Sequence, residues 1–383
     1  MIKNKNRIIA AVLAGVMAMS VMGCGKIDGS QTAATVDDET ISMGLLSFYT
    51  RFQQAQTSQL YMSMLGTDAS SMWDEEEDED AGTTYGDSLR DDALTQLEDM
   101  CLLKLHADEY EVTVTDEERQ KIQEAAAQFM KDNDAQTQER LAVSQEDIEH
   151  FLELSTYYQK MQDPIKDNVD TEVSDEEAAQ TTITYIQVKD DSGDSEGTAD
   201  EGTQETSAGE ETENAQTKAQ EILDQVLASA DADMDAIAKS VDEDLSASTR
   251  SYSTNDEEDT TVPDALKEAV SGLQDGEVDS SLVEDDGSYY VVRLDQAFDE
   301  EATENQKDTI ISERKQDLYD ETVQGWRDEA DIQENNGNIR KLKVTSSDSY
   351  TFKAQETTED TGSTGDTTEN GQTENTEDTG AEE

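Results

Sequence analysis

The sequence predicts an α+β protein, in which a helical domain precedes a smaller domain built on an antiparallel-rich sheet. Apolar residues recur at helical spacing through most of residues 36–180. Apolar and polar residues alternate in TITYIQVK (182–189), as they do in a strand, and Asp286-Gly287 forms a tight-turn signal between two more strand-like runs. Acidic stretches that lack large apolar residues separate or follow these segments, which predicts disorder there rather than further folded domains.

Composition narrows the possible functions. The chain has 383 residues, is 33% hydrophobic and carries a formal net charge of −66. This length allows two or three domains. Because contacts to phosphate need Lys and Arg, the charge predicts that nucleic acid is not a partner. The same charge gives no attraction to anionic lipid headgroups, so any membrane attachment must have another origin.

The N-terminus supplies a candidate anchor. MIKNKNRIIAAVLAGVMAMSVMGCGK has a basic start, then an apolar run over Ile8–Met22, and then Gly23-Cys24. This pattern is typical of a secretory signal. It resembles the lipobox of bacterial lipoproteins, which implies that residues 1–23 are removed and that Cys24 is lipidated and holds the protein on the outer side of the bacterial cell membrane. An ordinary signal peptide with a chance cysteine is the alternative. We expect residues 24–35 to form a tether.

Cysteine and histidine are too few for several kinds of site. With Cys24 lipidated, Cys101 is the only remaining thiol, so we expect no intramolecular disulfide and a buried packing role for Cys101. The two histidines, His106 and His150, lie in helical, leucine-rich contexts, where half-buried or surface positions are expected rather than zinc ligation or a hydrolase base. No glycine-rich nucleotide motif occurs. The sequence therefore predicts no metal and no cofactor.

Capping signals divide the first half of the chain into helices. Ser42 is a candidate N-cap for the first helix, and a second helix is expected within 89–110. Thr115 with Glu118 forms a capping box, and the same pattern recurs at 144–147 and 174–177. The acidic run at 74–80 lacks the glycine and the alternating ligands of a calcium loop, so it is predicted to be a solvated loop.

The second half alternates strands, helices and acidic stretches. A strand at 183–188 is followed by an acidic stretch at 190–218 that predicts a disordered insertion. The predicted order then continues with a helix whose inner face is Ile222, Leu223, Val226 and Leu227, a helix at 234–240, a helix started by Pro263, the two strands around Asp286-Gly287, a long helix at 301–330, a short strand within 341–352 and a disordered tail at 354–383.

This order of elements resembles a known family. LEDMCLLKLHADEYEVTVTDEE (97–118) and VPDALKEAVSGLQDGEVDSSLVEDDGSYYVVRL (262–294) are similar to segments of the extracytoplasmic parvulin-type foldases, the PrsA-like lipoproteins with a SurA-like helical chaperone domain. The resemblance implies a chaperone domain at 36–180 and a parvulin-like domain at 181–298. It also implies that residues 299–353 form a helix and strand that pack back on the helical domain.

The resemblance also implies a site, from which this sequence departs. Parvulins isomerise X-Pro bonds with two histidines on neighbouring strands, a Cys or Asp nearby and a small apolar pocket. Here the histidine positions hold Tyr185 and Tyr290, and Asp244 matches the acid position. The residues expected to line the pocket are Thr261, Ala265 and Leu266. The tyrosines are expected either to pack as cross-strand aromatics or to form a hydrogen-bond network with Asp244 that binds peptide.

The resemblance thus implies a membrane-anchored chaperone or foldase for unfolded exported proteins, with weak or no isomerase catalysis. An active peptidyl-prolyl isomerase and a binding lipoprotein without chaperone function are the alternatives. Whether the chain is a monomer or a dimer stays open at this point.

Overall fold

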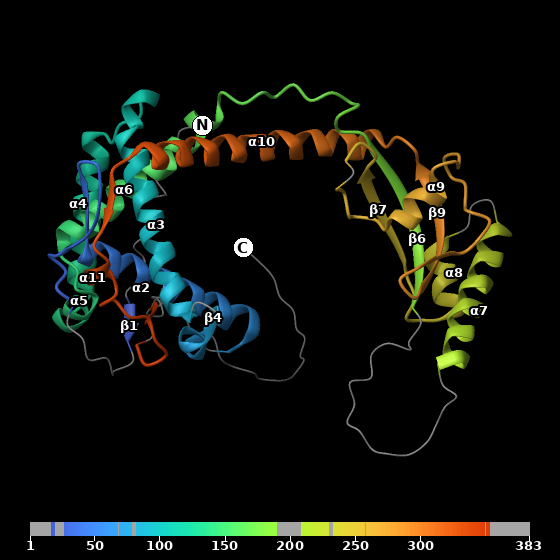
Figure 1. Cartoon of the computed structure of the whole chain (residues 1–383), viewed down its shortest axis with the longest axis horizontal. Helices are drawn as coiled ribbons and strands as arrows, with labels where there is room; N and C mark the ends of the chain where they lie inside the picture. The colour runs from blue at the N-terminus through green and yellow to red at the C-terminus, as the bar shows by residue number, and fades with distance from the viewer. Residues whose placement is uncertain are drawn as a thin grey trace, which may run out of the picture. The chain divides into compact units, whose positions relative to one another are not determined.

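The computed structural model describes residues 17–19, 27–67, 69–78, 82–189, 208–229, 233–256, 258–348 and 350–352. Two compact units make up the chain (Figure 1). Unit 1 comprises Met1–Cys101, Val114–Thr156 and Asp331–Glu383, and unit 2 comprises Leu102–Thr113 and Tyr157–Ala330. Unit 1 is mainly helical, whereas unit 2 is built on a four-stranded antiparallel sheet. The predicted α+β class is confirmed.

Helix α2 (Met43–Leu65) begins where the sequence predicted. The Oγ of Ser42 accepts a hydrogen bond from the Leu45 N–H at 2.9 Å, which satisfies one of the free N–H groups of the first turn. Further along α2, the ring of Phe48 lies edge-on to Phe129 and to Phe151, with ring centroids 5.3 Å apart in both pairs. These contacts join α2 to α4 (Asp116–Asp132) and α6 (Gln145–Lys166) in the core of unit 1.

Capping explains the other helix boundaries. Both halves of the predicted capping box between Thr115 and Glu118 are present at α4. Ser144 and Asp147 exchange the same pair of hydrogen bonds at the start of α6. The Ser174 hydroxyl also accepts a hydrogen bond from the Glu177 N–H, but only a turn follows. The capping pattern at 174–177 therefore does not start a helix. The remaining helical elements of the first half are η2 (Ala69–Asp74), α3 (Tyr85–Leu105), η3 (Ala107–Tyr110) and α5 (Ala135–Leu141).

A small sheet corrects the predicted tether. Strand β2 (Thr32–Val36) pairs with β3 (Glu39–Ser42) and, on its other side, with β10 (Ile332–Glu334). Ala33 and Ala34 are fully buried in this sheet. Residues 32–35 are therefore core rather than linker, because small side chains in a buried central strand leave no amphipathic pattern to read in the sequence.

The acidic run is also partly ordered. Strand β4 (Glu76–Asp78) pairs with β5 (Thr83–Thr84), so a solvated loop is wrong for residues 76–78. Trp73, which is buried, precedes this strand at the end of η2. Residues 79–81 lie outside the described part of the chain.

The C-terminal segment returns to unit 1. It contains α11 (Asn336–Ile339) and β11 (Tyr350–Phe352), and β11 pairs with β1 (Met17–Met19), which lies within the predicted signal segment. Arg51, which is buried, donates from Nη2 to the Asp348 carboxylate at 2.8 Å, and its guanidinium lies 4.6 Å from the centroid of the Tyr350 ring. Because Arg140 also pairs with Asp348 at 2.9 Å, the segment is held to α2 and α5 by a three-residue ionic cluster.

The sheet of unit 2 has the order β7-β6-β9-β8, with every neighbouring pair antiparallel. Its strands are β6 (Gln180–Lys189), β7 (Ala247–Ser253), β8 (Val283–Asp285) and β9 (Ser288–Gln296). Asp286 and Gly287 join β8 to β9 with φ of +43° and +69°, which is the backbone of the predicted tight turn. Strand β6 lies between β7 and β9. Because side chains alternate along a strand, its odd-numbered side chains point to one face of the sheet and its even-numbered side chains to the other.

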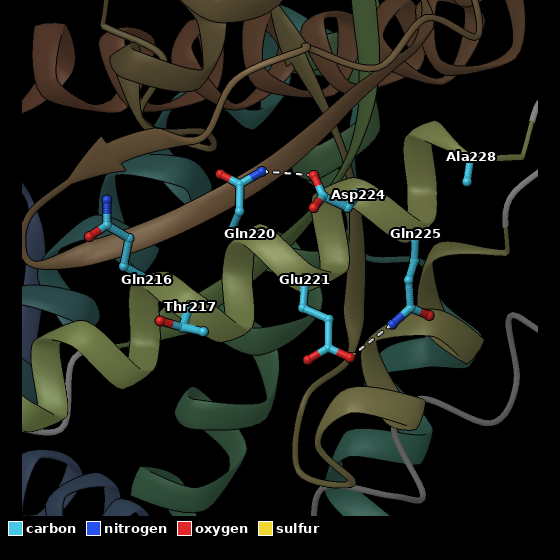
Figure 2. Close-up of a pocket in the computed structure, with 7 residues that line it drawn as sticks. All are labelled: Gln216, Thr217, Gln220, Glu221, Asp224, Gln225 and Ala228. Carbon is cyan, nitrogen blue, oxygen red and sulfur yellow. Dashed lines mark hydrogen bonds between the residues drawn. The ribbon is translucent and has the colours of Figure 1, made fainter.

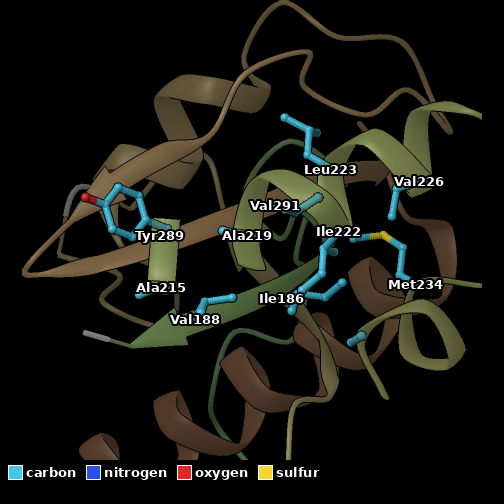
Figure 3. Close-up of a cluster of buried hydrophobic side chains, with 11 residues drawn as sticks. Ile186, Val188, Ala215, Ala219, Ile222, Leu223, Val226, Met234, Tyr289 and Val291 are labelled. Carbon is cyan, nitrogen blue, oxygen red and sulfur yellow. The ribbon is translucent and has the colours of Figure 1, made fainter. Parts of the chain in front are cut away.

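Helices cover both faces of this sheet. Helix α7 (Ala208–Leu227) and helix α8 (Met234–Val241) pack on the face that carries Ile186, Val188 and Val291, where they form a buried cluster (Figure 3). Helix α9 (Asp264–Val270) packs on the face that carries Ile183, Val292 and Leu294. The long helix α10 (Glu300–Glu329) follows β9, and its N-cap Asp299 ties it to the sheet.

Three predictions about the second half need correction. The predicted disordered insertion covers residues 190–218. Residues 190–207 lie outside the described part of the chain, but residues 208–218 form the start of helix α7, so disorder is wrong for them. Leu227, predicted for the inner face of this helix, is exposed, whereas Ile222, Leu223 and Val226 are buried. The predicted boundaries at 180/181 and 298/299 both fall inside unit 2, because this unit takes in Tyr157–Ala330.

Other predictions concern residues that are not described. Cys24 and the tail at 354–383 lie outside the described residues. No described helix combines the length and the apolar character needed to cross a membrane.

Candidate functional site

The two tyrosines predicted for the site lie side by side on the α9 face of the sheet. In the antiparallel register between β6 and β9, Tyr185 is opposite Val292 and Gln187 is opposite Tyr290. Tyr185 and Tyr290 are therefore diagonal neighbours, with ring centroids 6.0 Å apart and an interplanar angle of 60°. This edge-to-face geometry is the one that aromatic pairs prefer in a sheet.

Gln187 connects these rings to a hydrogen-bond network. Its Nε2 donates to the Tyr290 hydroxyl at 2.9 Å and to the Ser288 hydroxyl at 3.0 Å. The alternation of β6 placed Gln187 on the same face as Tyr185, but only the register with β9 shows that it reaches Tyr290. The Tyr290 hydroxyl thus already has a donor from within the sheet.

Tyr290 is buried, with 5% of its surface exposed, whereas Tyr185 is half-buried. Burial raises the pKa of Tyr290, and the nearby carboxylates of Asp285 and Asp286 raise it further. The phenol therefore stays neutral in the ordinary pH range. It can take part in hydrogen bonds, but it offers no charge to a reacting group.

Asp244 is not part of this cluster. It is exposed in the loop between α8 and β7, where its backbone N–H donates to Asp242 at 3.1 Å. Asp242 in turn pairs with Lys218 of α7 at 2.6 Å, which holds the loop against α7. Among the residues that the structure describes, no hydrogen bond or ring contact links Asp244 to either tyrosine. The structure therefore shows Gln187, and not Asp244, as the hydrogen-bond partner of this tyrosine pair.

The three residues predicted to line a proline pocket differ in how far they are buried. Thr261 is exposed, Ala265 is half-buried, and Leu266 is fully buried. Leu266 and Val270 are four residues apart on α9, so both point into the core beneath the helix, beside Tyr290. Leu266 is therefore part of the core, and a proline pocket lined by these three residues stays a prediction.

A different cavity, of about 540 Å³, lies at the end of the sheet beside α9. Lys267 reaches into this region, with its Nζ 5.7 Å from the centroid of the Tyr252 ring and 3.3 Å from the Asp264 carboxylate. Neither Tyr185 nor Tyr290 lines the cavity. The lining residues are Thr181, Tyr252, Ser253, Thr254, Asp256, Asp264, Lys267, Val270, Ser271, Leu273, Leu294 and Ala297. Sequence reasoning missed this cavity, because the ends of β6, β7 and β9 meet there only in the folded sheet.

The solvent face of α7 carries a second, shallow depression (Figure 2). Its side chains come from one helix and pair along it: Gln220 donates to Asp224 at 2.9 Å, and Gln225 donates to Glu221 at 3.3 Å. Pairs four residues apart are ordinary helix-surface contacts. This face therefore presents no group set aside for a ligand.

Threonines of β6 form two polar networks on the opposite face of the sheet. The Thr182 hydroxyl donates to the Asp299 carboxylate at 2.6 Å, and the Thr184 hydroxyl donates to the Asp295 carboxylate, also at 2.6 Å. Asp299 caps α10 and Asp295 accepts from Arg293, so both carboxylates have structural partners. The first network joins the sheet to the start of α10, and the second joins β6 to β9.

Both histidines are half-buried, as predicted, with His106 in the turn after α3 and His150 within α6. The ring of His106 stacks on Trp326 with ring centroids 4.3 Å apart and an angle of 3°, and its Nδ1 lies 2.7 Å from Glu109. His150 is half-buried and lies 3.5 Å from Glu39. Cys101 is fully buried, which confirms its predicted packing role. Within the described ranges, no three His, Cys, Asp or Glu side chains are grouped as metal ligands would be.

Comparison with known proteins identifies the N-terminal part of the chain. Residues 1–143 match the SurA-like N-terminal domain family, which confirms the predicted resemblance to SurA-like chaperones over this part. No curated protein matches the chain.

Several solved structures also match most of the chain. The foldase protein PrsA of Lactococcus lactis is 13% identical, with 82% of this chain and 98% of that chain covered and a TM-score of 0.32. The peptidylprolyl isomerase PrsA of Bacillus cereus is 17% identical, with 82% and 97% covered and a TM-score of 0.28. A SurA-like chaperone of Campylobacter jejuni is 14% identical, with 80% and 99% covered and a TM-score of 0.26.

Proposed function

We propose that this chain, which carries a SurA-like N-terminal domain, is an extracytoplasmic chaperone that binds unfolded exported proteins and is held at the bacterial cell membrane by a lipid on Cys24. The observation that carries the proposal is the match of residues 1–143 to the SurA-like N-terminal domain family. The basic and apolar N-terminus that ends in Gly23-Cys24 supports export and lipidation.

We further propose that the sheet of unit 2 is a scaffold or peptide-binding module with weak or no isomerase activity. Rotation about a peptide bond has a barrier of about 20 kcal/mol, and an enzyme lowers such a barrier by stabilising the twisted amide more than the planar one. The sheet offers few groups for this: Tyr290 is buried and already bonded to Gln187, and Asp244 is exposed in a separate loop. The region between residues 181 and 298 contains no histidine.

An aggregation assay tests the chaperone function. An unfolded secreted protein is diluted from denaturant in the presence of the full chain in detergent, and light scattering is followed. We expect the chain to suppress scattering at an equimolar ratio. An unchanged rise in scattering would contradict the proposal and favour a binding lipoprotein without chaperone function.

A protease-coupled assay on an X-Pro peptide tests the second part. We expect a rate close to the uncatalysed one in the wild-type chain. Strong catalysis that disappears in Asp244→Ala would show an active isomerase and overturn this part of the proposal, while the chaperone proposal would stand.

A further inference from the structure

The last turns of α2 are apolar yet exposed. The sequence LYMSML at residues 60–65 has large apolar side chains at every position but Ser63. Leu60, Met62, Met64 and Leu65 expose 53%, 53%, 72% and 64% of their surface. Because successive residues of a helix are turned by about 100°, these four side chains spread over roughly 200° of the helix circumference. A surface helix normally buries its apolar side against the core, so this end of α2 lacks the cover that its composition calls for.

This surface is held in place by the ordered part of the same helix. The first half of α2 is fixed in the core of unit 1 through buried residues such as Leu45, Leu46 and Phe48. At the other end, Gly66 adopts φ of +67° and its N–H bonds to the Met62 carbonyl at 3.2 Å, which closes the helix. The apolar end is therefore part of a regular helix that is anchored at one end and capped at the other. Its two methionines are flexible, polarisable side chains of the kind that accommodate partners of different shape.

An acidic segment lies next along the chain. Element η2 packs against α2, and its Trp73 is buried. Glu75, Glu76 and Glu77 follow directly, and all three are exposed. The Tyr85 N–H donates to the Glu75 carbonyl at 3.1 Å, which holds the segment in position.

The charge of this segment is uncompensated. The structure records no ion pair between Glu75–Glu77 and any described Lys, Arg or His side chain. Burial raises the pKa of Asp92 on α3, and the negative charges of Glu77 and Asp91 raise it further, which fits a local excess of negative charge. A partner with basic side chains would be attracted here, whereas an acidic partner would be repelled. A second copy of this chain, at −66, falls in the repelled class.

We propose that Leu60–Leu65 and Glu75–Glu77 form a docking surface for unfolded polypeptide segments in which large apolar side chains lie near Lys or Arg. The apolar end of α2 provides the affinity, and the glutamates select the charge. This inference rests on the proposed chaperone function and gives the class of segment that it takes.

Fluorescence anisotropy with labelled peptides tests the docking surface. Two probe peptides share the same leucines and phenylalanines, and one carries lysines where the other carries glutamates. We expect the full chain to bind the lysine peptide at least about tenfold more tightly than the glutamate peptide, a difference of roughly 1.4 kcal/mol. Added salt should reduce this difference, because it screens exposed charges.

Variants locate the binding. In Met62→Ser/Met64→Ser/Leu65→Ser we expect affinity for the lysine peptide to fall at least about tenfold. Leu227→Ser/Phe298→Ser removes exposed apolar side chains from unit 2, and we expect it to bind as the wild type does. Glu75→Gln/Glu76→Gln/Glu77→Gln should bring the two peptides to similar affinity. All substituted side chains are exposed, and circular dichroism verifies that each variant folds.

Each contrary result has a definite meaning. The proposal is overturned if the wild type binds neither peptide, if the triple serine variant binds as tightly as the wild type, or if both peptides bind equally. Sedimentation that shows a dimer which only the triple serine variant loses would instead make this surface a self-association site. If the triple serine variant still suppresses client aggregation as the wild type does, this site fails and the chaperone function stands. If the wild type suppresses no aggregation, the proposed function itself fails.

Discussion

At the scale of single residues, the two tyrosines of the pair differ in how much their hydroxyl groups contribute to the stability of the fold. The hydroxyl of Tyr290 accepts from Gln187 in a buried setting, whereas Tyr185 is half-buried and the structure records a ring contact but no hydrogen bond for its hydroxyl. A buried polar group that loses its partner is costly, whereas an accessible one can turn to water.

Tyr290→Phe and Tyr185→Phe therefore form a matched pair. We expect Tyr290→Phe to lower the free energy of unfolding by about 1 kcal/mol, because Gln187 loses one of its acceptors. Tyr185→Phe should change it by less than about 0.5 kcal/mol. Urea denaturation followed by circular dichroism measures both. Equal losses in the two variants would mean that the Gln187 bond does not distinguish them.

Asp299 gives a pH-dependent prediction. Hydrogen bonds from the Ala302 N–H and the Thr182 hydroxyl to its carboxylate lower its pKa. The carboxylate thus stabilises the fold fully above its unfolded pKa of about 3.9, and this stabilisation is lost as the pH falls through the lower pKa of the folded state.

We expect Asp299→Ala to lower the free energy of unfolding by about 1 kcal/mol at pH 7, as removal of a helix N-cap does. The loss should shrink when urea denaturation is repeated at about pH 3. Asp299→Asn keeps a cap acceptor but cannot titrate, so its loss should be smaller than that of Asp299→Ala at pH 7 and should also shrink at about pH 3, because the wild type loses the charged cap there. A loss from Asp299→Ala that does not change with pH would rule out the charged cap.

At the scale of elements, a close approach of the chain fixes the C-terminal segment on α3. A Cβ at Gly86 would lie 2.1 Å from the Val344 carbonyl oxygen and 2.8 Å from that of Trp73. Both neighbours are backbone atoms, which cannot move aside as a flexible side chain can. Gly325, within α10, has no heavy atom that its Cβ would meet within 4 Å.

Gly86→Ala and Gly325→Ala should thus have opposite effects. We expect Gly86→Ala to lower the free energy of unfolding by about 1–3 kcal/mol through overpacking. Gly325→Ala should raise it by about 0.5–1 kcal/mol, because alanine favours a helix interior. Thermal unfolding of the two variants compares them directly. Two changes of the same sign would contradict the close approach at Gly86.

The elements that sequence reasoning predicted are those set by local signals. The capping box at Thr115 and the turn at Asp286-Gly287 depend on residues a few positions apart, and both are present. Helix α7 was predicted to begin too late because two of its buried side chains, Ala215 and Ala219, are small and give little apolar signal. Strand β2 was missed because its fully buried side chains, Ala33 and Ala34, are small and leave no alternating pattern in the sequence.

The candidate site divides in the same way. The alternation of β6 correctly placed Tyr185 with Ile183 on one face, and the strand positions brought Tyr290 beside it. Asp244 was misplaced because the pairing of Lys218 with Asp242, which no local pattern shows, holds its loop against α7. Leu266 was predicted to line a pocket, but the packing of α9 on the sheet buries it.

At the scale of the whole molecule, the net charge of −66 and the single candidate lipidation site have separate roles. Such a charge repels an anionic membrane surface, so the proposed membrane retention would have to depend on acyl chains buried in the bilayer. In a bacterial host fed a labelled fatty acid, we expect the wild-type chain to carry label and to sediment with membranes. Cys24→Ser should lose both properties.

Cys101→Ala is the matched control for that experiment. It removes the other cysteine of the sequence, which is buried in the core. We expect labelling and membrane retention to persist in this variant. Label that remains on Cys24→Ser, or a wild-type chain without label, would contradict the lipid anchor.

The chain path through the two sheets has a further consequence. The piece that ends at Lys189 carries β2, β3 and β6, and the piece that begins at Ala208 carries β7, β9 and β10. Strand β6 pairs with β7 and β9, and β2 pairs with β10, so each sheet needs strands from both pieces. Two separately expressed halves would thus associate through two sets of strand pairs, one in each sheet. The pairing that forms first would raise the effective concentration of the strands that form the second. Cleavage of the chain between Lys189 and Ala208 would therefore leave two pieces that can reassociate through the pairing of their strands.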